Sequence, residues 1–522
     1  MAENINVPAN ETITIPFSRP SMTHKCIICK AKSPLVVVPS LAKLRVFVKH
    51  GLIIYGKARC CKRHLKDSFF NVTDSNRIEA VSDTSTLSAS QITDLLNDLR
   101  VCVQRGFLDF ENPGALSDID YHRLTRISGE NFDNLFSYVK SEIYSTHGRS
   151  ARTYIEILLV KLRTGLSHSI LSTLFDLPRR TVGKAIRSAR KALLKCFVPM
   201  HLGLYHITRD NFIKEHTRNL AKNLFAEGED VAILVANGTY VYIKKSSNYS
   251  FQRWTYSLHK GRPLVKPMMM VSITGYILEV FGPYFADGKN NDASILNNLV
   301  KQIRSRLLQW INPEDVLIVD RGFRDVIMTL EEYELIPKMP NFLQQGSQHD
   351  ILSANESRLV TAIRWVVEAV NGLLKTWKML AQVIPNSQIS YIGDFVRIVA
   401  ALCNVYRPPR VEAFSPDDEI IAQRMLARSR KTNGLQKYIE DNGWIRRSVI
   451  WRKIKATSIA DFPRLTLDDL HKITIGVYQL KQASSYAREH MSDEGNYVFY
   501  VHQESDILRV KLQSRHTSLK QY

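Results

Sequence analysis

The stretch VAILVANGTYVYI, residues 231–243, decides the fold together with VLIVDRGFRD at residues 316–325. Each begins with an apolar run of strand length, and the runs end at Asn237-Gly238 and at Asp320-Arg321-Gly322. Short apolar runs bounded by glycine are typical of buried β-strands. Open α/β sheets carry their chemistry at the carboxyl ends of strands, so we expect Asn237 and Asp320 to lie at a functional edge.

A helix is predicted over residues 357–377, SRLVTAIRWVVEAVNGLLKTW. Its polar residues Arg364, Glu368, Asn371 and Lys375 follow one another at offsets of four, three and four, which places them on one helix face. A carboxylate flanked by two cations and an amide suits a site for metal and phosphate together. The alternative is structural: Glu368 forms an ordinary salt bridge with Arg364 or Lys375, and Asp320 pairs with Arg324.

Four stretches together resemble a known family: NGTYVYI, YSLHKGRPLVKPMMMVSITGYI, VDRGFRD and NESRLVTAIRWVVEAVNGLLK. They are similar to the core of the DDE superfamily endonucleases, the transposases of the Harbinger and Insertion Sequence Four type. The resemblance covers roughly residues 150–405. It implies an α/β ribonuclease H-like domain over residues 231–407, a mixed sheet with flanking helices, which cuts DNA by phosphoryl transfer.

In that family three acids hold two divalent cations, Mg²⁺ or Mn²⁺. By position, Asp320 is the second acid and Glu368 the third. Arg364 and Lys375 match the Arg and Lys of the related Tyr-Arg-Glu-Lys signature and would contact DNA, while Thr361 stands where its Tyr would be.

The first acid is missing, because the family position before Gly238-Thr239 holds Asn237. An amide oxygen can still bind a metal, but it brings no charge, and two Mg²⁺ ions about 3.5–4 Å apart repel each other unless carboxylates lie between them. A loss of about 3–4 kcal/mol of transition-state stabilisation would slow the reaction about 10²–10³-fold. Asp292 and Glu356 are spare acids, although neither stands at the family position.

Two functions therefore remain open. The first is a DDE transposase-like endonuclease whose metal-dependent catalysis is impaired by Asn237. The second is a domesticated or decayed transposase that acts as a zinc-containing DNA-binding protein without catalysis. The resemblance also leaves open whether the chain forms a homo-oligomer or needs a separate DNA-binding partner.

A zinc-binding module is predicted over residues 21–70. Cys26 and Cys29 form one pair of ligands separated by two residues, and Cys61 and His64 form a second pair. Four such ligands suit structural Zn²⁺ in tetrahedral geometry. Cys60 is the alternative to Cys61, and free core thiols are the alternative to a metal site. Seven cysteines in 522 residues do not indicate a disulfide framework, so a reducing compartment is expected.

Positive charge indicates an anionic partner, since 71 Lys and Arg exceed 50 Asp and Glu by 21. Residues 149–195 carry eleven of these cations and two acids. The pattern predicts three helices within residues 149–200, with Gly165 ending the first, Ser167 capping the second and Pro178 in the first turn of the third. This is typical of a helix-turn-helix that binds DNA, and the last helix would present Arg179, Arg180, Lys184 and Arg187. The alternative is a solvated basic helix.

The other segments carry weaker signals. We expect a disordered tail at 1–20, a linker at 71–98 with a helix starting at Ser90, a helical region at 99–148, a connector at 201–230 and a basic region at 408–522. In the last, Trp444 and Trp451 lie among cations, a composition that suits nucleic acid. His259, Lys260 and Arg262 either contact DNA or decorate a hairpin. No apolar run reaches the length of a membrane span, and a DNA substrate favours residence in the nucleus.

Overall fold

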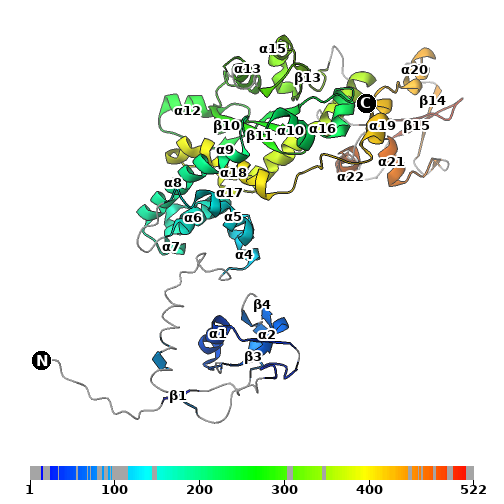
Figure 1. Ribbon diagram of the computed structural model, residues 1–522. Coiled ribbons are helices and arrows are strands. Elements are labelled where there is room, and N and C mark those ends of the chain that lie inside the picture. Colours follow the sequence, from blue (N-terminus) through cyan, green and yellow to red (C-terminus); the bar gives the residue numbers. More distant parts are fainter. Residues whose placement is uncertain are drawn as a thin grey trace. The chain divides into compact units, whose positions relative to one another are not determined.

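The computed structural model describes most of the chain (Figure 1). The described residues are 13–15, 24–32, 34–54, 57–66, 69–70, 72–78, 85–87, 92–93, 96, 116–143, 150–302, 310–343, 349–444, 450–455, 458–459, 462–473, 478–490 and 498–512. The chain divides into two compact units, Met1–Phe197 with Trp377–Met379 and Val198–Thr376 with Leu380–Tyr522, and each is described by itself.

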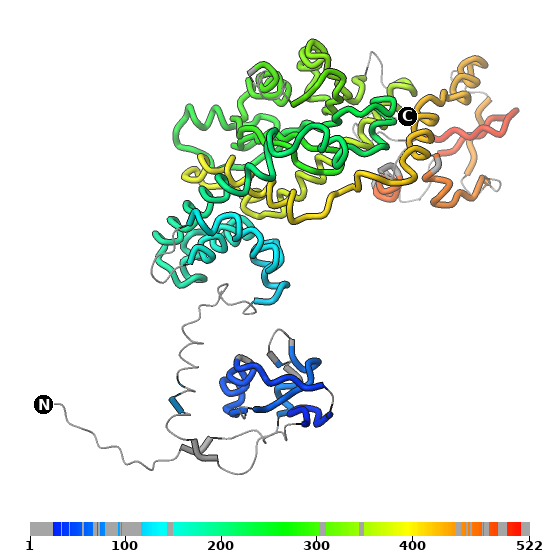
Figure 2. The backbone as a smooth tube through the Cα atoms, viewed as in Figure 1, coloured from blue at the N-terminus to red at the C-terminus, as the bar shows by residue number. Residues whose placement is uncertain are grey.

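The first unit contains a small N-terminal module, the blue body of Figure 2. Strands β2 (Leu35–Val37) and β3 (Arg59–Cys61) pair antiparallel, and helix α1 (Ser40–His50) lies between them in the chain. Short elements complete the module: η1 (Lys62–His64), β4 (Leu65–Lys66), β5 (Phe69–Phe70) and α2 (Val72–Ser75). A small apolar core that includes Ile27, Val46 and Phe70 holds them together.

Two short strands differ from the sequence expectation. β1 (Ile13–Ile15) and β6 (Ser85–Leu87) pair antiparallel, within the predicted tail and linker. Ile13, Thr14, Ile15 and Thr86 are β-branched, and such residues favour extended backbone. This local preference accounts for strands inside segments that were expected to be a tail and a linker. The predicted helix start at Ser90 lies outside the described residues.

Among the described residues of the first unit, further helices follow in the chain: α4 (Asp118–Thr125), α5 (Gly129–Val139), α6 (Ala151–Thr164), α7 (His168–Leu174) and α8 (Arg179–Cys196). Their ends are set by local chemistry. The Ser167 hydroxyl accepts from the Ile170 amide at 3.3 Å at the start of α7, and Gly165 closes α6 with a left-handed φ of 72°. Pro178 stands at the cap before α8, one position earlier than the predicted first turn.

The second unit is built on a mixed sheet, reached through α9 (Val198–His201), α10 (Arg209–His216) and α11 (Asn219–Phe225). Its strands are β7 (Ile233–Gly238), β8 (Val241–Tyr242), β9 (Tyr256–Ser257), β10 (Arg262–Ser272), β11 (Ile277–Phe285), β12 (Val316–Ile318) and β13 (Ile336–Lys338). The order is β11-β10-β7-β12-β13, and β8 and β9 also pair with β10. β7, β12 and β13 run parallel, whereas β10 is antiparallel to both β7 and β11.

Helices cover both faces of this sheet (Figure 1), which explains why the central strands β7 and β12 are mostly apolar and buried. Alternate residues such as Leu234 and Leu317 share one core with α13 (Asp292–Gln302), η2 (Arg321–Val326) and α15 (Ile327–Glu332). On the other side, α16 (Ile351–Lys375) contacts β7 and α18 (Ile392–Tyr406) contacts β11. The remaining elements around the sheet are α12 (Tyr249–Thr255), α17 (Lys378–Ala381) and η3 (Asn386–Tyr391).

The C-terminal region adds further helices and a small antiparallel sheet in the order β14-β15-β16. Its elements are α19 (Asp418–Ser429), α20 (Gly434–Asp441), β14 (Trp451–Ile454), α21 (Leu467–Ile473), α22 (Tyr478–His490), β15 (Phe499–His502) and β16 (Leu508–Val510). α19 contacts α11 and α16, and Arg218 binds the buried Asp418 carboxylate at 2.6 Å. The segment after residue 407 therefore begins as part of the second unit.

One stretch among the described residues, Asn386–Tyr406, is long and apolar enough to cross a membrane by length and composition. Half of it is buried inside the protein, where α18 packs on β11. The core helix of a globular protein passes the same test.

Candidate functional site

The parallel pairing of β7 and β12 brings Asn237 and Asp320 to one sheet edge. Val235 is the register partner of Ile318, so continuing the same register by two residues sets Asp320 beside Asn237. Asn237 itself belongs to β7, where it pairs with Met269 of β10. The strand ends therefore meet as the sequence pattern predicts.

A cavity of about 340 Å³ lies at this edge. Its lining consists of Asn237, Gly238, Thr239, Tyr240, Tyr242, Asp292, Asp320, Arg364, Glu368, Asn371 and Lys375. All four polar residues of the predicted face of α16 are among them. One 25-residue helix therefore supplies these four side chains, because the 3.6-residue period places them on the same face.

Asp320 is held by the turn that follows β12. Its Oδ1 accepts the Gly322 amide at 2.7 Å and caps η2. A Cβ on Gly322 would lie 3.0 Å from that oxygen, so glycine keeps this turn open. Arg324 pairs with Asp325 at 3.3 Å, and not with Asp320 as in the structural alternative.

Glu368 and Lys375 are both engaged in this structure. Arg364 donates to Glu368 Oε1 at 2.6 Å, with Arg364 mostly buried and Glu368 61% exposed. The Lys375 ammonium donates to the carbonyls of Tyr240 and Leu380, and burial lowers the pKa of Lys375 to about 8. Lys375 therefore ties the end of α16 to the strand side of the cavity, which is a structural role that the sequence did not indicate.

Asp292 lines the cavity, although the sequence predicted it only as a spare acid outside the family position. It begins α13, and its Oδ1 would lie 3.0 Å from a Cβ on Gly238, so glycine at 238 lets the carboxylate approach. Lys266 of β10 lies 3.4 Å from the same oxygen. Burial, then the charges of Asp292 and Asp320, raises the pKa of Tyr240 to about 12. No local sequence signal could place Asp292 here, because the approach depends on how α13 packs on the sheet.

The other spare acid, Glu356, lies elsewhere on α16. Its Oε2 accepts from the Asn341 side chain at 2.8 Å, and it does not line the cavity. Thr361 also stays outside the lining and donates to the Ser357 carbonyl at 2.7 Å.

The oxygen donors of the cavity are of the kind that Mg²⁺ and Mn²⁺ bind. Asn371 Oδ1 is buried and, within the part of the chain that the structure describes, accepts no hydrogen bond. Such an oxygen fits a cation or its water ligand. However, position 237 is neutral, and cations already pair with Asp292 and Glu368. The oxygen ligands are therefore of the right chemical type for a divalent metal, but their total negative charge is low for such a site.

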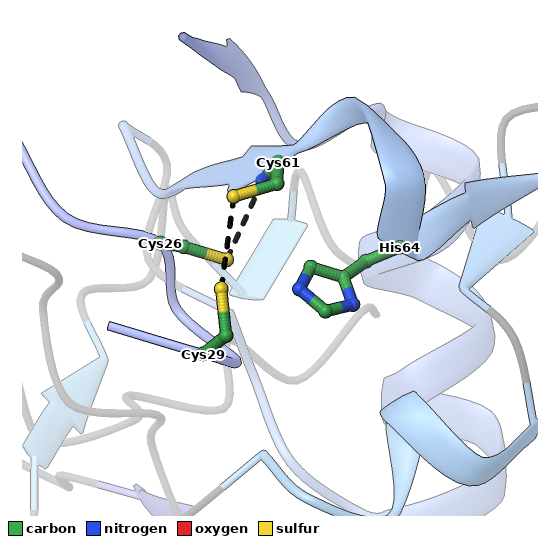
Figure 3. Close-up of side chains that lie close together, drawn as sticks. All are labelled: Cys26, Cys29, Cys61 and His64. Atoms are coloured by element: carbon green, nitrogen blue, oxygen red, sulfur yellow. Dashed lines mark hydrogen bonds between the residues drawn. The ribbon is translucent and has the colours of Figure 1, made fainter. Parts of the chain in front are cut away.

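The predicted cysteine and histidine ligands converge in the N-terminal module (Figure 3). One ligand atom from each of Cys26, Cys29, Cys61 and His64 lies within 4.8 Å of the others. Cys29 Sγ is 3.7 Å from Cys61 Sγ, and Cys26 Sγ accepts the Cys61 amide at 3.4 Å. Cys60 is not in this group, so β3 presents Cys61 and not Cys60 to the cluster.

His64 is oriented by a second residue. Its Nδ1 lies 2.9 Å from Asp74 Oδ2, while among the described residues no hydrogen-bond partner meets its buried Nε2. A carboxylate on one ring nitrogen that leaves the other for a metal is the usual arrangement of a zinc-bound histidine. The cluster could therefore hold a metal ion.

Helix α8 separates its apolar and basic sides. Val182, Ala185 and Ile186 are buried, whereas the predicted DNA-contacting residues are all exposed: Arg179, Arg180, Lys184 and Arg187. The Arg190 side chain is mostly buried. One end of α8 thus presents a cationic surface of the sort that contacts phosphates.

The tryptophans of the C-terminal region are packed against neighbours. The Trp444 ring lies 3.9 Å from the His502 ring, centroid to centroid, and Trp451 lies 5.2 Å from it. Trp451 Nε1 also donates to the Trp444 carbonyl at 3.0 Å. Both rings help to hold β14, β15 and α20 together. The sequence predicted contacts with nucleic acid for these tryptophans and gave no sign of this packing role.

Residues 236–404 match the family model described as DDE superfamily endonuclease. The match spans the sheet from the end of β7 through α18, and it confirms the resemblance for this segment, which is less than half of the chain. No curated protein matches the chain.

Proposed function

We propose that residues 231–407 form a ribonuclease H-like endonuclease domain of the transposase type whose catalysis is impaired. The observation that carries the proposal is the cavity itself, where Asp320 and Glu368 stand beside a neutral Asn237. Support for the fold comes from the mixed sheet with helices on both faces, within the segment that matches the family.

Asp320, Glu368 and Asn237 would hold the divalent metal, with Asp292 as an additional carboxylate. When bound, such a metal activates the attacking oxygen and stabilises the leaving oxygen in phosphoryl transfer. For Glu368 to bind a metal through Oε1 or through both oxygens, its bond to Arg364 must open, and the released Arg364 could then pair with a DNA phosphate.

The second candidate is a DNA-binding protein without catalysis. The four exposed cations of α8 favour it, because they need no metal to contact DNA. In this reading the helices α6 to α8 act as a helix-turn-helix, and the protein works in the nucleus.

We also propose structural Zn²⁺ at Cys26, Cys29, Cys61 and His64. A cluster of three thiols and one imidazole around a small core is the ligand set that holds zinc in small modules. Zinc would stabilise this module and would take no part in cleavage.

The test is a nicking assay on supercoiled DNA with Mn²⁺ or Mg²⁺, comparing the wild type with Asn237→Asp. A restored carboxylate should raise cleavage about 10²–10³-fold, corresponding to about 3–4 kcal/mol. Asp320→Ala in the Asn237→Asp background should remove the gain. The matched control is Asn442→Asp, which adds the same charge at an exposed position.

The outcomes separate the two candidates. Cleavage by the Asn237→Asp variant alone shows that the wild type does not cut and assigns it to DNA binding, whereas weak wild-type cleavage that Asn237→Asp raises supports the impaired nuclease. Equal cleavage by both, abolished by Asp320→Ala, shows that the wild type is a working enzyme. Cleavage by neither variant overturns the endonuclease proposal, and DNA affinity measured separately then tests the second candidate.

A further inference from the structure

The segment of residues 244–262, KKSSNYSFQRWTYSLHKGR, is strongly one-sided in charge. It contains five cations and no acid. All five are exposed: Lys244, Lys245, Arg253, Lys260 and Arg262. A surface of this kind attracts a polyanion.

The same segment exposes aromatic surface. Tyr249 is 80% exposed and Trp254 is 50% exposed, although side chains of this size are mostly covered in folded proteins. Trp254 stacks on Phe285 with centroids 6.0 Å apart and planes inclined by 25°. Phe251 meets the same Phe285 ring edge-on at 5.9 Å.

Trp254 is also held in place through its backbone. Its carbonyl accepts the Ala286 amide at 3.0 Å, and Asn248 caps α12 by accepting the Phe251 amide at 2.9 Å. The indole is therefore supported by another ring and fixed by its helix while half of its surface meets solvent. Such a platform can stack on a base with little loss of side-chain entropy.

The segment borders the cavity through two cation–π contacts. Lys260 Nζ lies 5.1 Å from the centroid of the Tyr240 ring, and the Arg262 guanidinium lies 4.8 Å from the centroid of Tyr242. Both tyrosines line the cavity. A nucleic-acid strand with one phosphate at the cavity would meet these cations next along its backbone.

We propose that residues 244–262 bind an unpaired stretch of a DNA strand beside the cavity, with Trp254 stacking on a base and Lys260 and Arg262 contacting phosphates. The choice of DNA as the ligand rests on the proposed function. A base inside a duplex has no free face for the indole, so the surface suits single-stranded DNA. A second copy of this chain, with its net charge of +21, is a poor occupant for a surface of five cations.

The experiment measures the affinity of the full chain for a fluorescent single-stranded 20-mer and for the matched duplex, by anisotropy. A salt concentration of about 0.3 M weakens all phosphate contacts, including those of Lys260 and Arg262, so that base stacking on Trp254 contributes a larger share of the affinity. We expect Trp254→Ala to weaken single-strand binding about 5- to 150-fold, the range for one stacked base, and to leave duplex binding within about twofold. Trp254→Phe should recover most of the loss, because it keeps a ring on Phe285.

Matched variants give the proposal its controls. Tyr205→Ala removes an aromatic that is 72% exposed on the same unit, and it should not alter single-strand affinity. Arg262→Ala should lower the salt slope for single strands by about 0.7, whereas Trp254→Ala should leave the slope unchanged. Circular dichroism of each variant verifies folding.

Several results would overturn the inference. Single-strand affinity of Trp254→Ala equal to the wild type would do so, and so would an equal loss for single strand and duplex. Sedimentation that shows the wild type as an oligomer and Trp254→Ala as a monomer would make the surface a self-association site. If the wild type binds neither DNA, the proposed function fails as well, whereas wild-type binding without a Trp254 effect removes this inference alone.

Discussion

Adjacent cysteines provide a sharp test of the zinc cluster, because Cys60→Ser and Cys61→Ser make the same chemical change at neighbouring positions. Both thiols are buried, but only Cys61 belongs to the ligand group. Both cysteines pack in the apolar core of the module, and Cys60 makes no contribution to the ligand group there. We therefore expect Cys61→Ser to weaken metal binding and Cys60→Ser to leave the metal ligands intact, although the two substitutions are equal in size and both sites are buried.

The magnitude follows from the number of ligands. A structural zinc site of this size binds with about 10–16 kcal/mol, so one of four ligands accounts for about 2.5–4 kcal/mol. Losing Cys61 should weaken binding about 10²–10³-fold. Cys60→Ser buries a hydroxyl in an apolar site, which costs about 1–3 kcal/mol of folding free energy and leaves all four ligands in place.

Because metal binding is coupled to folding, affinity alone cannot separate these effects, and the assay should count thiolates. Cobalt replaces zinc in tetrahedral sites, and its sulfur-to-metal charge-transfer absorbance scales with the number of bound thiolates. This absorbance should fall by about one third in Cys61→Ser, from three thiolates to two, and stay unchanged in Cys60→Ser. A fall in Cys60→Ser with none in Cys61→Ser would refute the placement of β3. Absence of cobalt absorbance in the wild type would refute the metal site itself.

Three further predictions concern stability and DNA binding. Asp315→Ala should lower the unfolding free energy by about 3–5 kcal/mol in urea titrations, because Asp315 is buried and binds Arg209 at 2.5 Å. His216→Phe should flatten the fall in stability between pH 6.5 and 4, since burial, and then the nearby charge of His206, lowers the pKa of His216 to about 4. The unfolded histidine, with a pKa near 6.5, takes up its proton first as the pH falls, so this residue costs about 3 kcal/mol of stability at pH 4. Arg180→Ala should lower the slope of log affinity for duplex DNA against log salt by about 0.9.

Each of these has a result that contradicts it. Asp325→Ala, an exposed control, should change stability by less than about 0.5 kcal/mol, and an equal loss in both aspartate variants would deny the buried pair its role. An acid slope that persists unchanged in His216→Phe would assign it to other groups. A salt slope unchanged by Arg180→Ala would leave α8 as a solvated basic helix.

Much of the candidate site could be predicted from local sequence patterns. The face of α16 with Arg364, Glu368, Asn371 and Lys375 follows from helical period alone, and the structure places all four on one cavity. The pairs Cys26 with Cys29 and Cys61 with His64 follow from chelate spacing, and their four ligand atoms do converge. These predictions succeed because they depend on backbone geometry within a few residues.

Contacts between segments far apart in the sequence could not be predicted from such local patterns. Asp292 reaches the cavity only because α13 packs on the sheet and Gly238 has no side chain. Trp444 and Trp451 read as surface residues among cations, yet they pack around His502, which lies about fifty residues further along the chain. Trp254 lies on helix α12 and is supported by Phe285 at the end of strand β11.

By itself, the sequence determined the strand ends at Asn237 and Asp320, the polar face of α16, the two pairs of cysteine and histidine ligands and the neutral amide at position 237, because period, caps and ligand spacing are local properties of the chain. Tertiary structure alone decided which of Cys60 and Cys61 faces the cluster, that Asp292 approaches Gly238, and which cations are already paired. A strand register or a helix packing angle sums interactions from segments far apart, so a shift of one residue turns a side chain to the opposite face. The charges that attract DNA are visible in the composition, while the place where a strand would lie depends on the folded surface.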